Sequence, residues 1–315
     1  MKTFKTAVIG LGLSCLAITA AAEPVTVTSC NRQVTFDAPP VRAVSNDVNL
    51  TEMMLVLGLR DNMAGYTGVS GWKTLDENMR SGIEELPELS AKYPSKEVIL
   101  GADADLYFAG WNYGLKVGGE VTPDTLAPFG VKVYELTESC IHIMEKDQIS
   151  MDDMYVDLLN LGTIFGVRDR AETLVAGYKQ ELETFYASLE TGDRPLRAFV
   201  YDSGEEKPFT AGRYGMPTAL IEAAGGINIM DDIEKSWTLI GWEPVVERNP
   251  QVIVIVNYGD VTAEEKRAFM MSNPAFADMD AVKNDRFVVL EYVEATPGPR
   301  NISAIQKLAS AFWAE

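Results

Sequence analysis

The apolar and polar positions of this chain repeat one unit, once in each half. The unit is a short helix-compatible segment that begins at an acidic residue, continues through a proline or polar break, and ends in an apolar strand. It occupies residues 97–110, beginning at Glu97, and residues 243–257, beginning at Glu243. A helix that leads into a fully apolar strand is typical of a parallel α/β sheet, because such strands are buried on both faces. The repetition predicts two similar lobes, although two unrelated helix–strand units would give the same pattern.

Strands and helices alternate around both units. In the first half the pattern predicts a hairpin over 25–36, a strand from 42, a helix over 49–58, a strand over 62–68, a helix near 123–129 and a strand over 131–136. In the second half it predicts strands over 196–201, 252–256 and 286–290, and a closing helix over 302–313. Alternation of this kind is typical of parallel, doubly wound sheets.

The middle of the chain has a different pattern, with two helical segments over 150–165 and 169–190 that contain almost no helix breakers. A helix of ~22 residues would span roughly 33 Å, about the width of a small lobe. We therefore predict an α/β protein of two doubly wound, Rossmann-like lobes joined by one long helix, with a ligand cleft between the lobes. The expected boundaries are 23–150 for the first lobe, 151–192 for the helical connector and 193–315 for the second lobe.

The N-terminus has the pattern of an export signal. Lys2 and Lys5 precede an apolar run that ends in three alanines before Glu23, which predicts a cleaved signal peptide over 1–22 and a periplasmic protein. Cys15 leaves lipidation open, although Gly12 stands where a lipidation motif would carry leucine. No later segment reaches the roughly 18–20 apolar residues of a membrane span.

Charge excludes one class of partner. Without Lys2 and Lys5, 25 of the 27 basic residues remain against 46 acidic ones, so the exported chain carries a net charge near −21. Nucleic acid is therefore not expected as a partner, because neutralising phosphates requires a basic surface.

Two cysteines, Cys30 and Cys140, remain once the signal peptide is removed. An even number in an oxidising compartment predicts a disulfide that ties the first hairpin to the first lobe. Two free buried thiols are the alternative.

Several short motifs occur in order along the whole exported chain. They are the run 39–45, the segment 51–59, the unit from Ser95 to Leu106, the long middle helix, Ala224–Asn228, Trp242-Glu243, Asn249-Pro250 and Ala281–Arg286. In these motifs the chain resembles the periplasmic substrate-binding proteins of ABC importers that take up iron–siderophores, haem and cobalamin. The resemblance implies a monomer with lobes that move little, a ligand between them, and a permease dimer with its ATPase subunits as partner.

The resemblance also implies a role for the paired acidic residues. Glu97 and Glu243 match the acidic residues, one on each lobe tip, that dock onto arginines of the permease. Charge pairs of this kind favour orientation and association rate more than affinity. A simpler role for both residues is an acidic charge that favours the N-terminus of a helix.

Candidate ligand residues follow from the strand ends, because ligands of open α/β sheets bind beyond the carboxyl ends of the strands. Trp111 and Tyr113 form the leading pair, with core packing as the alternative, since aromatic rings with polar tips suit a large organic chelate. Arg213 is a candidate partner for an anionic ligand, or else a surface arginine. The full set is Asn46, Tyr66, Trp111, Asn112, Tyr113, Tyr201, Arg213, Tyr214, Trp237, Tyr258 and Tyr292.

Other site chemistry is disfavoured. The one histidine, His142, makes a bare metal ion an unfavourable ligand, although axial ligation of a haem or corrin by His142 stays open. No nucleophile elbow and no glycine-rich phosphate loop accompanies it, so we expect no enzyme and no cofactor. The expected ligand is a preformed metal chelate, a ferric siderophore first, with cobalamin or haem as alternatives.

Overall fold

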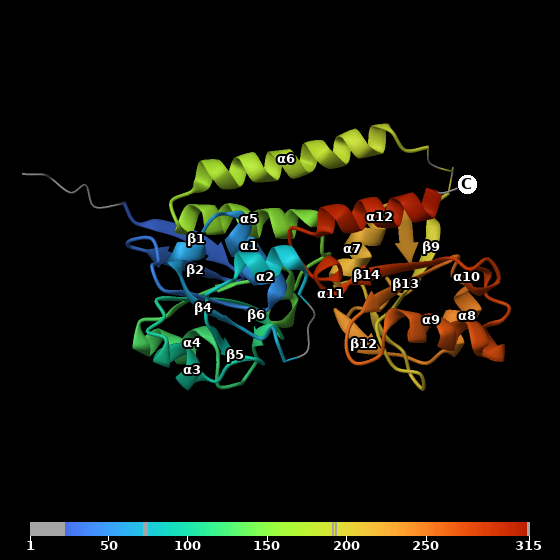
Figure 1. The fold of residues 1–315 in the computed structure, drawn as a ribbon, viewed down its shortest axis with the longest axis horizontal. Helices are drawn as coiled ribbons and strands as arrows, with labels where there is room; N and C mark the ends of the chain where they lie inside the picture. Colours follow the sequence, from blue (N-terminus) through green and yellow to red (C-terminus); the bar gives the residue numbers. More distant parts are fainter. Residues whose placement is uncertain (1–22, 72–74, 191, 193, 314–315) are drawn as a thin grey trace, which may run out of the picture.

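The protein folds into two α/β lobes that lie side by side (Figure 1). The structure is a computed structural model that describes residues 23–71, 75–190, 192 and 194–313. The predicted signal peptide, with Cys15, lies outside the described residues. No helix within the described ranges is long and apolar enough to cross a bilayer.

The first lobe is built on a parallel sheet. The order β5-β4-β3-β6 continues from β6 to both β8 and β7. These strands are β3 (Ala43–Asn46), β4 (Met63–Thr67), β5 (Glu88–Ser90), β6 (Leu106–Trp111), β7 (Gly114–Leu115) and β8 (Lys132–Glu135). The helices of this lobe are α1 (Val48–Val56), α2 (Glu77–Gly82), α3 (Lys96–Gly101), α4 (Pro123–Leu126) and α5 (Met151–Ile164), with 3₁₀ turns η1 (Arg60–Asn62), η2 (Ala127–Phe129) and η3 (Glu138–His142).

The second lobe repeats this plan with a smaller parallel sheet in the order β11-β9-β13-β14. Its strands are β9 (Leu196–Tyr201), β11 (Gly226–Asn228), β13 (Val252–Asn257) and β14 (Phe287–Glu291). Its helices are α7 (Met216–Ala223), α8 (Glu243–Arg248), α9 (Ala263–Ser272), α10 (Asp280–Lys283), α11 (Tyr292–Ala295) and α12 (Asn301–Trp313), with the 3₁₀ turn η4 (Pro274–Phe276). A separate antiparallel pair, β10 (Phe209–Ala211) and β12 (Trp237–Leu239), lies beside this sheet.

Burial on both faces explains the apolar strands. Every residue of β6 is buried, as are the first five residues of β13. One hydrophobic cluster, which includes residues of α5, α6 and α12, packs against one face of both sheets, and a further cluster packs against the opposite face of each sheet. The doubly wound α/β fold expected from the alternating pattern is confirmed.

The long helix α6 (Arg168–Ala187) runs along both lobes, over α5 of the first and α12 of the second (Figure 1). Its apolar side chains at 174, 178, 182 and 185 pack into the shared core. The preceding helix, α5, begins with a capping box, in which the side chains of Ser150 and Asp153 accept hydrogen bonds from each other's backbone amides.

The first hairpin, β1 (Val25–Ser29) and β2 (Arg32–Phe36), is fastened to the first lobe by the predicted disulfide. Cys30 and Cys140 are bonded, with their Cα atoms 5.3 Å apart. The buried carboxylate of Glu135 adds polar anchors, because it accepts hydrogen bonds from the Ser29 hydroxyl at 2.7 Å and from the Arg32 guanidinium at 2.5 Å.

Candidate functional site

A cavity of about 350 Å³ lies between the two lobes, at the carboxyl ends of their strands. The first lobe contributes the turn after β6 and the end of η3, and the second lobe contributes the segments after β9 and β13 together with β12 and α11. This is where open α/β sheets place ligands. The lining residues are Asn112, Tyr113, His142, Asp202, Phe209, Ser236, Trp237, Val256, Tyr258, Tyr292, Ala295 and Thr296.

Aromatic rings form much of the wall on the side of the second lobe. Phe209 and Trp237 are stacked, with ring centroids 5.7 Å apart and planes 22° apart, because β10 and β12 pair antiparallel at this edge. Tyr258 and Tyr292, at the ends of β13 and β14, lie with centroids 4.9 Å apart. Rings held in this way offer flat apolar contact with polar tips.

The polar groups of the cavity come from both lobes. The side-chain nitrogen of Asn112 lies 3.1 Å from Nε2 of His142. Burial lowers the pKa of His142, so the ring is neutral at pH 7. Across the cavity, Asp202 accepts a hydrogen bond of 2.8 Å from the Ser203 hydroxyl, and burial raises the pKa of its carboxyl.

The cavity has little positive charge to offer a ligand. Among the described residues that line it, none is lysine or arginine, and Asp202 is its acidic residue. Lys266 is buried, and its ammonium donates to the backbone carbonyls of Val256 at 2.7 Å and Tyr258 at 2.9 Å. Lys266 therefore binds the backbone at the end of β13 and is not part of the cavity lining, so the wall itself is neutral or acidic.

Five of the predicted ligand residues line this cavity together. They are Asn112, Tyr113, Trp237, Tyr258 and Tyr292. The strand-end rule therefore selects residues from both lobes that line one cavity, and their role in ligand binding stays a prediction.

Three predicted residues of the first lobe lie elsewhere. Trp111 was expected to face the cleft, but its ring is buried in the core on the other side of the sheet and its indole N–H donates to Glu135 at 3.0 Å. Asn46 is fully buried and accepts a hydrogen bond from the Thr67 hydroxyl at 2.8 Å. Tyr66 is a core residue.

Three predicted residues of the second lobe also lie outside the cavity. Tyr201 is buried against Trp242, with ring centroids 5.4 Å apart. The Arg213 guanidinium, expected in the cleft, instead donates to the backbone carbonyl of Asp231 at 2.9 Å and forms an ion pair with Glu234 at 3.5 Å. Tyr214 packs against the main hydrophobic cluster.

Seven lining residues were absent from the predicted ligand set: His142, Asp202, Phe209, Ser236, Val256, Ala295 and Thr296. Of these, His142 had been considered only as an axial ligand of a haem or corrin. A signal existed for Asp202, because it directly follows the strand over 196–201. Phe209 and Ser236 carried no such signal, since the short strands β10 and β12 depend on tertiary pairing.

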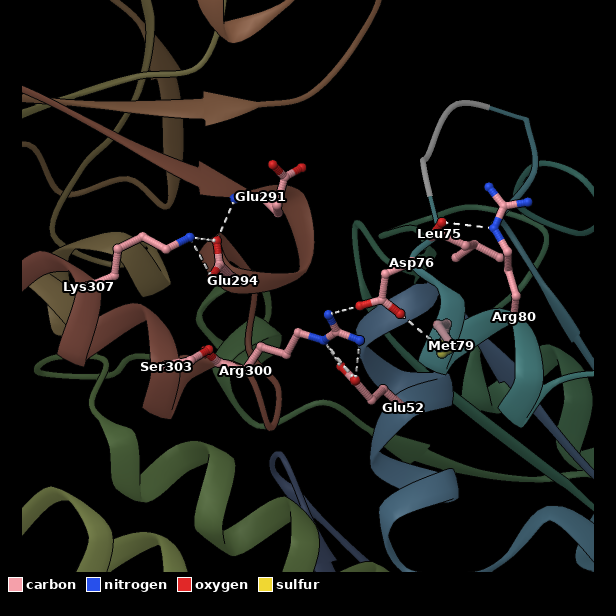
Figure 2. A network of polar contacts seen from close by, with 10 residues as sticks. All are labelled: Glu52, Leu75, Asp76, Met79, Arg80, Glu291, Glu294, Arg300, Ser303 and Lys307. Carbon is pink, nitrogen blue, oxygen red and sulfur yellow. Dashed lines mark hydrogen bonds and ion pairs between the residues drawn. The ribbon is translucent and has the colours of Figure 1, made fainter.

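Polar contacts join the two lobes beside the cavity. Figure 2 shows Arg300, which precedes α12, contacting two acidic side chains of the first lobe. Its guanidinium lies 2.7 Å from the Glu52 carboxylate and also bonds Asp76. Burial raises the pKa of Glu52, whereas the hydrogen bond from Arg300 lowers the pKa of Asp76.

Two more contacts cross the same junction. The Tyr292 hydroxyl donates to the buried carboxylate of Asp47 at 2.9 Å, and the Asn49 amide donates to the carbonyl of Pro297 at 2.7 Å. The cavity wall at Tyr292 is thus held by both lobes.

The two acidic residues of the repeated unit lie on separate lobes. Glu97 is exposed in the first turn of α3, and Glu243 is exposed as the first residue of α8. Hydrogen bonds from its own backbone amide and from Ser95 lower the pKa of Glu97, which keeps this carboxylate ionised.

Comparison with known proteins agrees with this architecture. Residues 44–293 match the family model described as periplasmic binding protein. A vitamin B12-binding protein of Pectobacterium atrosepticum is 24% identical over 277 residues, which cover 87% of this chain and 88% of the relative.

Solved structures share the fold. A periplasmic binding protein from Veillonella parvula superposes with a TM-score of 0.81 at 28% identity, covering 93% of this chain and 98% of that one. A chain described as an ABC-type Fe3+-hydroxamate transport system, from Saccharomonospora viridis, gives a TM-score of 0.78 at 24% identity, covering 93% and 100%.

Proposed function

Because this chain belongs to the periplasmic binding protein family, we propose that it captures a metal chelate without net negative charge and delivers it to the permease of an ABC importer. The first choice of ligand is a corrinoid. The observation that carries this choice is the cavity wall, which combines stacked aromatic rings with Asp202 and contains no lysine or arginine among its described residues.

A corrinoid suits this wall for three reasons. Its broad ring fits flat aromatic surfaces such as those of Trp237 and Tyr258, and its amide side chains donate hydrogen bonds that Asp202 accepts. Its lack of net negative charge avoids repulsion by that carboxylate. The neutral imidazole of His142 offers a nitrogen at the opposite wall, suited to an axial position on a metal. Curated relatives named for vitamin B12 and cobalamin support the same choice.

Anionic chelates suit the wall less well. A ferric tricatecholate, or the carboxylates of haem, would need a cation, because an unpaired buried charge is costly. The expected cation, Arg213, is held by Asp231 and Glu234 outside the cavity. The ferric siderophore that the sequence placed first is therefore a second candidate, restricted to uncharged ferric trihydroxamates.

Delivery to a permease rests on the two exposed carboxylates. Glu97 and Glu243 occupy the first turns of short helices on different lobes. A carboxylate on each lobe could contact a twofold transporter at two places at once, and so orient the protein as it docks. We propose the periplasm as the site of action, reached through the N-terminal signal segment, with the protein acting as a monomer.

The test is a titration of the purified protein with five probes. These are cyanocobalamin, a neutral ferric trihydroxamate, a ferric tricatecholate, haemin and free Fe³⁺, followed by calorimetry and by tryptophan fluorescence. Cyanocobalamin should bind and quench Trp237, and Asp202→Asn should weaken its binding relative to that of the tricatecholate. Trp111→Phe is the matched control, since Trp111 lies outside the cavity. Tight binding of the tricatecholate or of free Fe³⁺, without binding of cyanocobalamin, would refute the proposal.

A further inference from the structure

A second carboxylate lies beneath the cavity, outside its lining. Glu138 is the first residue of η3 in the first lobe and is 1% exposed. Its Oε1 lies 3.5 Å from the hydroxyl of Ser236, which lines the cavity in the second lobe. Its Oε2 is buried and has no hydrogen-bond partner among the described residues. Few buried carboxyl groups leave an oxygen unpaired, so this one calls for an explanation.

The surroundings of Glu138 favour its neutral form. Burial, and then the neighbouring charge of Asp153, raise the pKa of Glu138 to about 8. Lys146 and the backbone N–H of Met216 oppose this rise only in part, while Asp157 adds to it. At pH 7 the carboxyl is therefore mostly protonated, and an O–H on the unpaired oxygen gives it a donor to offer.

The contacts of Glu138 reach both lobes. Asp153 and Lys146 belong to the first lobe, and the phenol of Tyr113, a cavity residue, also senses the Glu138 charge. Ser236 and the start of α7 at Met216 belong to the second lobe. A change in the charge of Glu138 therefore alters the electrostatic environment at the junction of the lobes and at two residues of the cavity wall, Tyr113 and Ser236.

We propose that Glu138, in its uncharged form, is a positioning residue that holds Ser236 and the start of α7 against the first lobe, so that ligand binding weakens when Glu138 ionises. The inference rests on the proposed function in that it takes the cavity to be the ligand site. Ionisation buries a charge at the junction with incomplete compensation, and this favours separation of the lobes and entry of water.

The sign of the pH dependence follows. A carboxyl whose pKa in the closed protein lies above its ordinary value binds its proton more tightly when the lobes are closed. Its contribution is therefore complete at acidic pH and is lost as the pH rises through about 8. By linkage, a ligand that needs both lobes loses affinity by at most about tenfold per pH unit as the pH rises from the ordinary carboxyl range towards about 8, and the loss levels off above that pH.

The matched variants are Glu138→Gln and Asp157→Asn. The amide introduced by Glu138→Gln keeps one acceptor and gains a donor but cannot ionise. Asp157 is also fully buried, with a pKa raised by burial to about 7, but its hydrogen bonds from Tyr134 and Thr137 stay within the first lobe. Removing the Asp157 charge should only displace the Glu138 titration slightly to lower pH.

The experiment measures two quantities from pH 6 to pH 9 in each protein: Trp237 fluorescence without ligand, and the dissociation constant for cyanocobalamin. The wild type and Asp157→Asn should show a fluorescence change and a loss of affinity that grow as the pH rises towards 8 and level off above it, and Glu138→Gln should show neither. Identical fluorescence profiles for the wild type and Glu138→Gln would overturn the proposal. Failure of cyanocobalamin to bind at any pH would count against the corrinoid alone, because the fluorescence profile still decides the role of Glu138. If Glu138→Gln does not fold, Glu138→Leu, which also cannot ionise, replaces it and should abolish the fluorescence transition; persistence of that transition would overturn the proposal.

Discussion

Removing the disulfide should destabilise the protein while leaving its native structure in place. The perturbation is the double variant Cys30→Ala with Cys140→Ala. The bond closes a segment with a sequence separation of 110 residues. On the chain-entropy account, closing a loop of that length lowers the conformational entropy of the unfolded chain and so raises its free energy by roughly 4.8 kcal/mol. Without the disulfide, the free energy of unfolding should therefore fall by roughly 4–5 kcal/mol.

The native position of the hairpin should survive this change because other contacts hold it. Ser29 and Arg32 both bond the buried Glu135, and the Asn160 amide donates to the carbonyl of Thr28 at 3.3 Å. The loss should therefore arise mainly in the unfolded state. That state becomes more expanded, so the dependence of the unfolding free energy on urea should become steeper.

The assay is urea denaturation followed by circular dichroism, with and without a phosphine reductant. Reduction of the wild type should reproduce the double variant, and the variant itself should not respond to the reductant. Ligand affinity at low urea should be unchanged. A fall of less than about 1 kcal/mol, or a displaced hairpin in the variant, would show that the chain-entropy reasoning does not apply to this bond.

Four further variants test docking, ligand binding and the contact between the lobes separately. Reversing Glu97 and Glu243 to lysine should abolish uptake through the cognate permease at an unchanged ligand dissociation constant; normal uptake would remove the docking role. Trp237→Ala should weaken ligand binding by roughly 1–3 kcal/mol in calorimetry, whereas Trp111→Ala should cost roughly 3–5 kcal/mol of stability and leave affinity unaltered. The reverse pattern would mean that the cavity is not the ligand site. Arg300→Ala leaves the carboxylate of Glu52 buried without its partner and should cost roughly 2 kcal/mol at pH 7, with recovery as Glu52 becomes protonated at lower pH. Equal losses at pH 4.5 and pH 8 in thermal melts would argue against that explanation.

The sequence predicted those helices and strands whose local pattern of apolar residues is sufficient to identify them. The strand β13 is a continuous apolar run, and α6 repeats apolar residues every three or four positions, so both could be recognised before any tertiary contact was known. The pair β10 and β12 could not be recognised in this way. Each has three residues, and their pairing is set by how the chain returns across the edge of the sheet.

The outcome at Trp111 and Tyr113 has a specific physical reason. Two residues apart on a regular strand would share one face. Between them Asn112 has a φ of 66°, in the left-handed region, and this turns the chain. Trp111 therefore enters the core while Tyr113 lines the cavity. A strand-end rule finds such a segment but cannot tell which of its aromatic rings faces the ligand.

Arg213 illustrates a different limit. Its charge suggested a ligand partner, but the carbonyl of Asp231 and the carboxylate of Glu234 in the following segment already bind it. Nothing in the linear pattern distinguishes an arginine bound by its own lobe from one that faces a cleft.

The contacts beside the cavity also fix the order in which a working protein can form. Arg300 bonds Glu52 across 248 residues of chain and Asp76 across 224, and the bond between Tyr292 and Asp47 spans 245. A chain that emerges from its N-terminus can complete the first sheet long before Arg300 and Tyr292 arrive, since lobes generally fold as units. Until residues 292–300 have emerged, Glu52 lacks its partner from the second lobe, because only then does Arg300 reach it. Truncation before Tyr292, which removes both bridging residues, should therefore yield a product that retains a folded first lobe but lacks a completed cleft, so the segment that begins at Tyr292 completes the assembly of the two lobes.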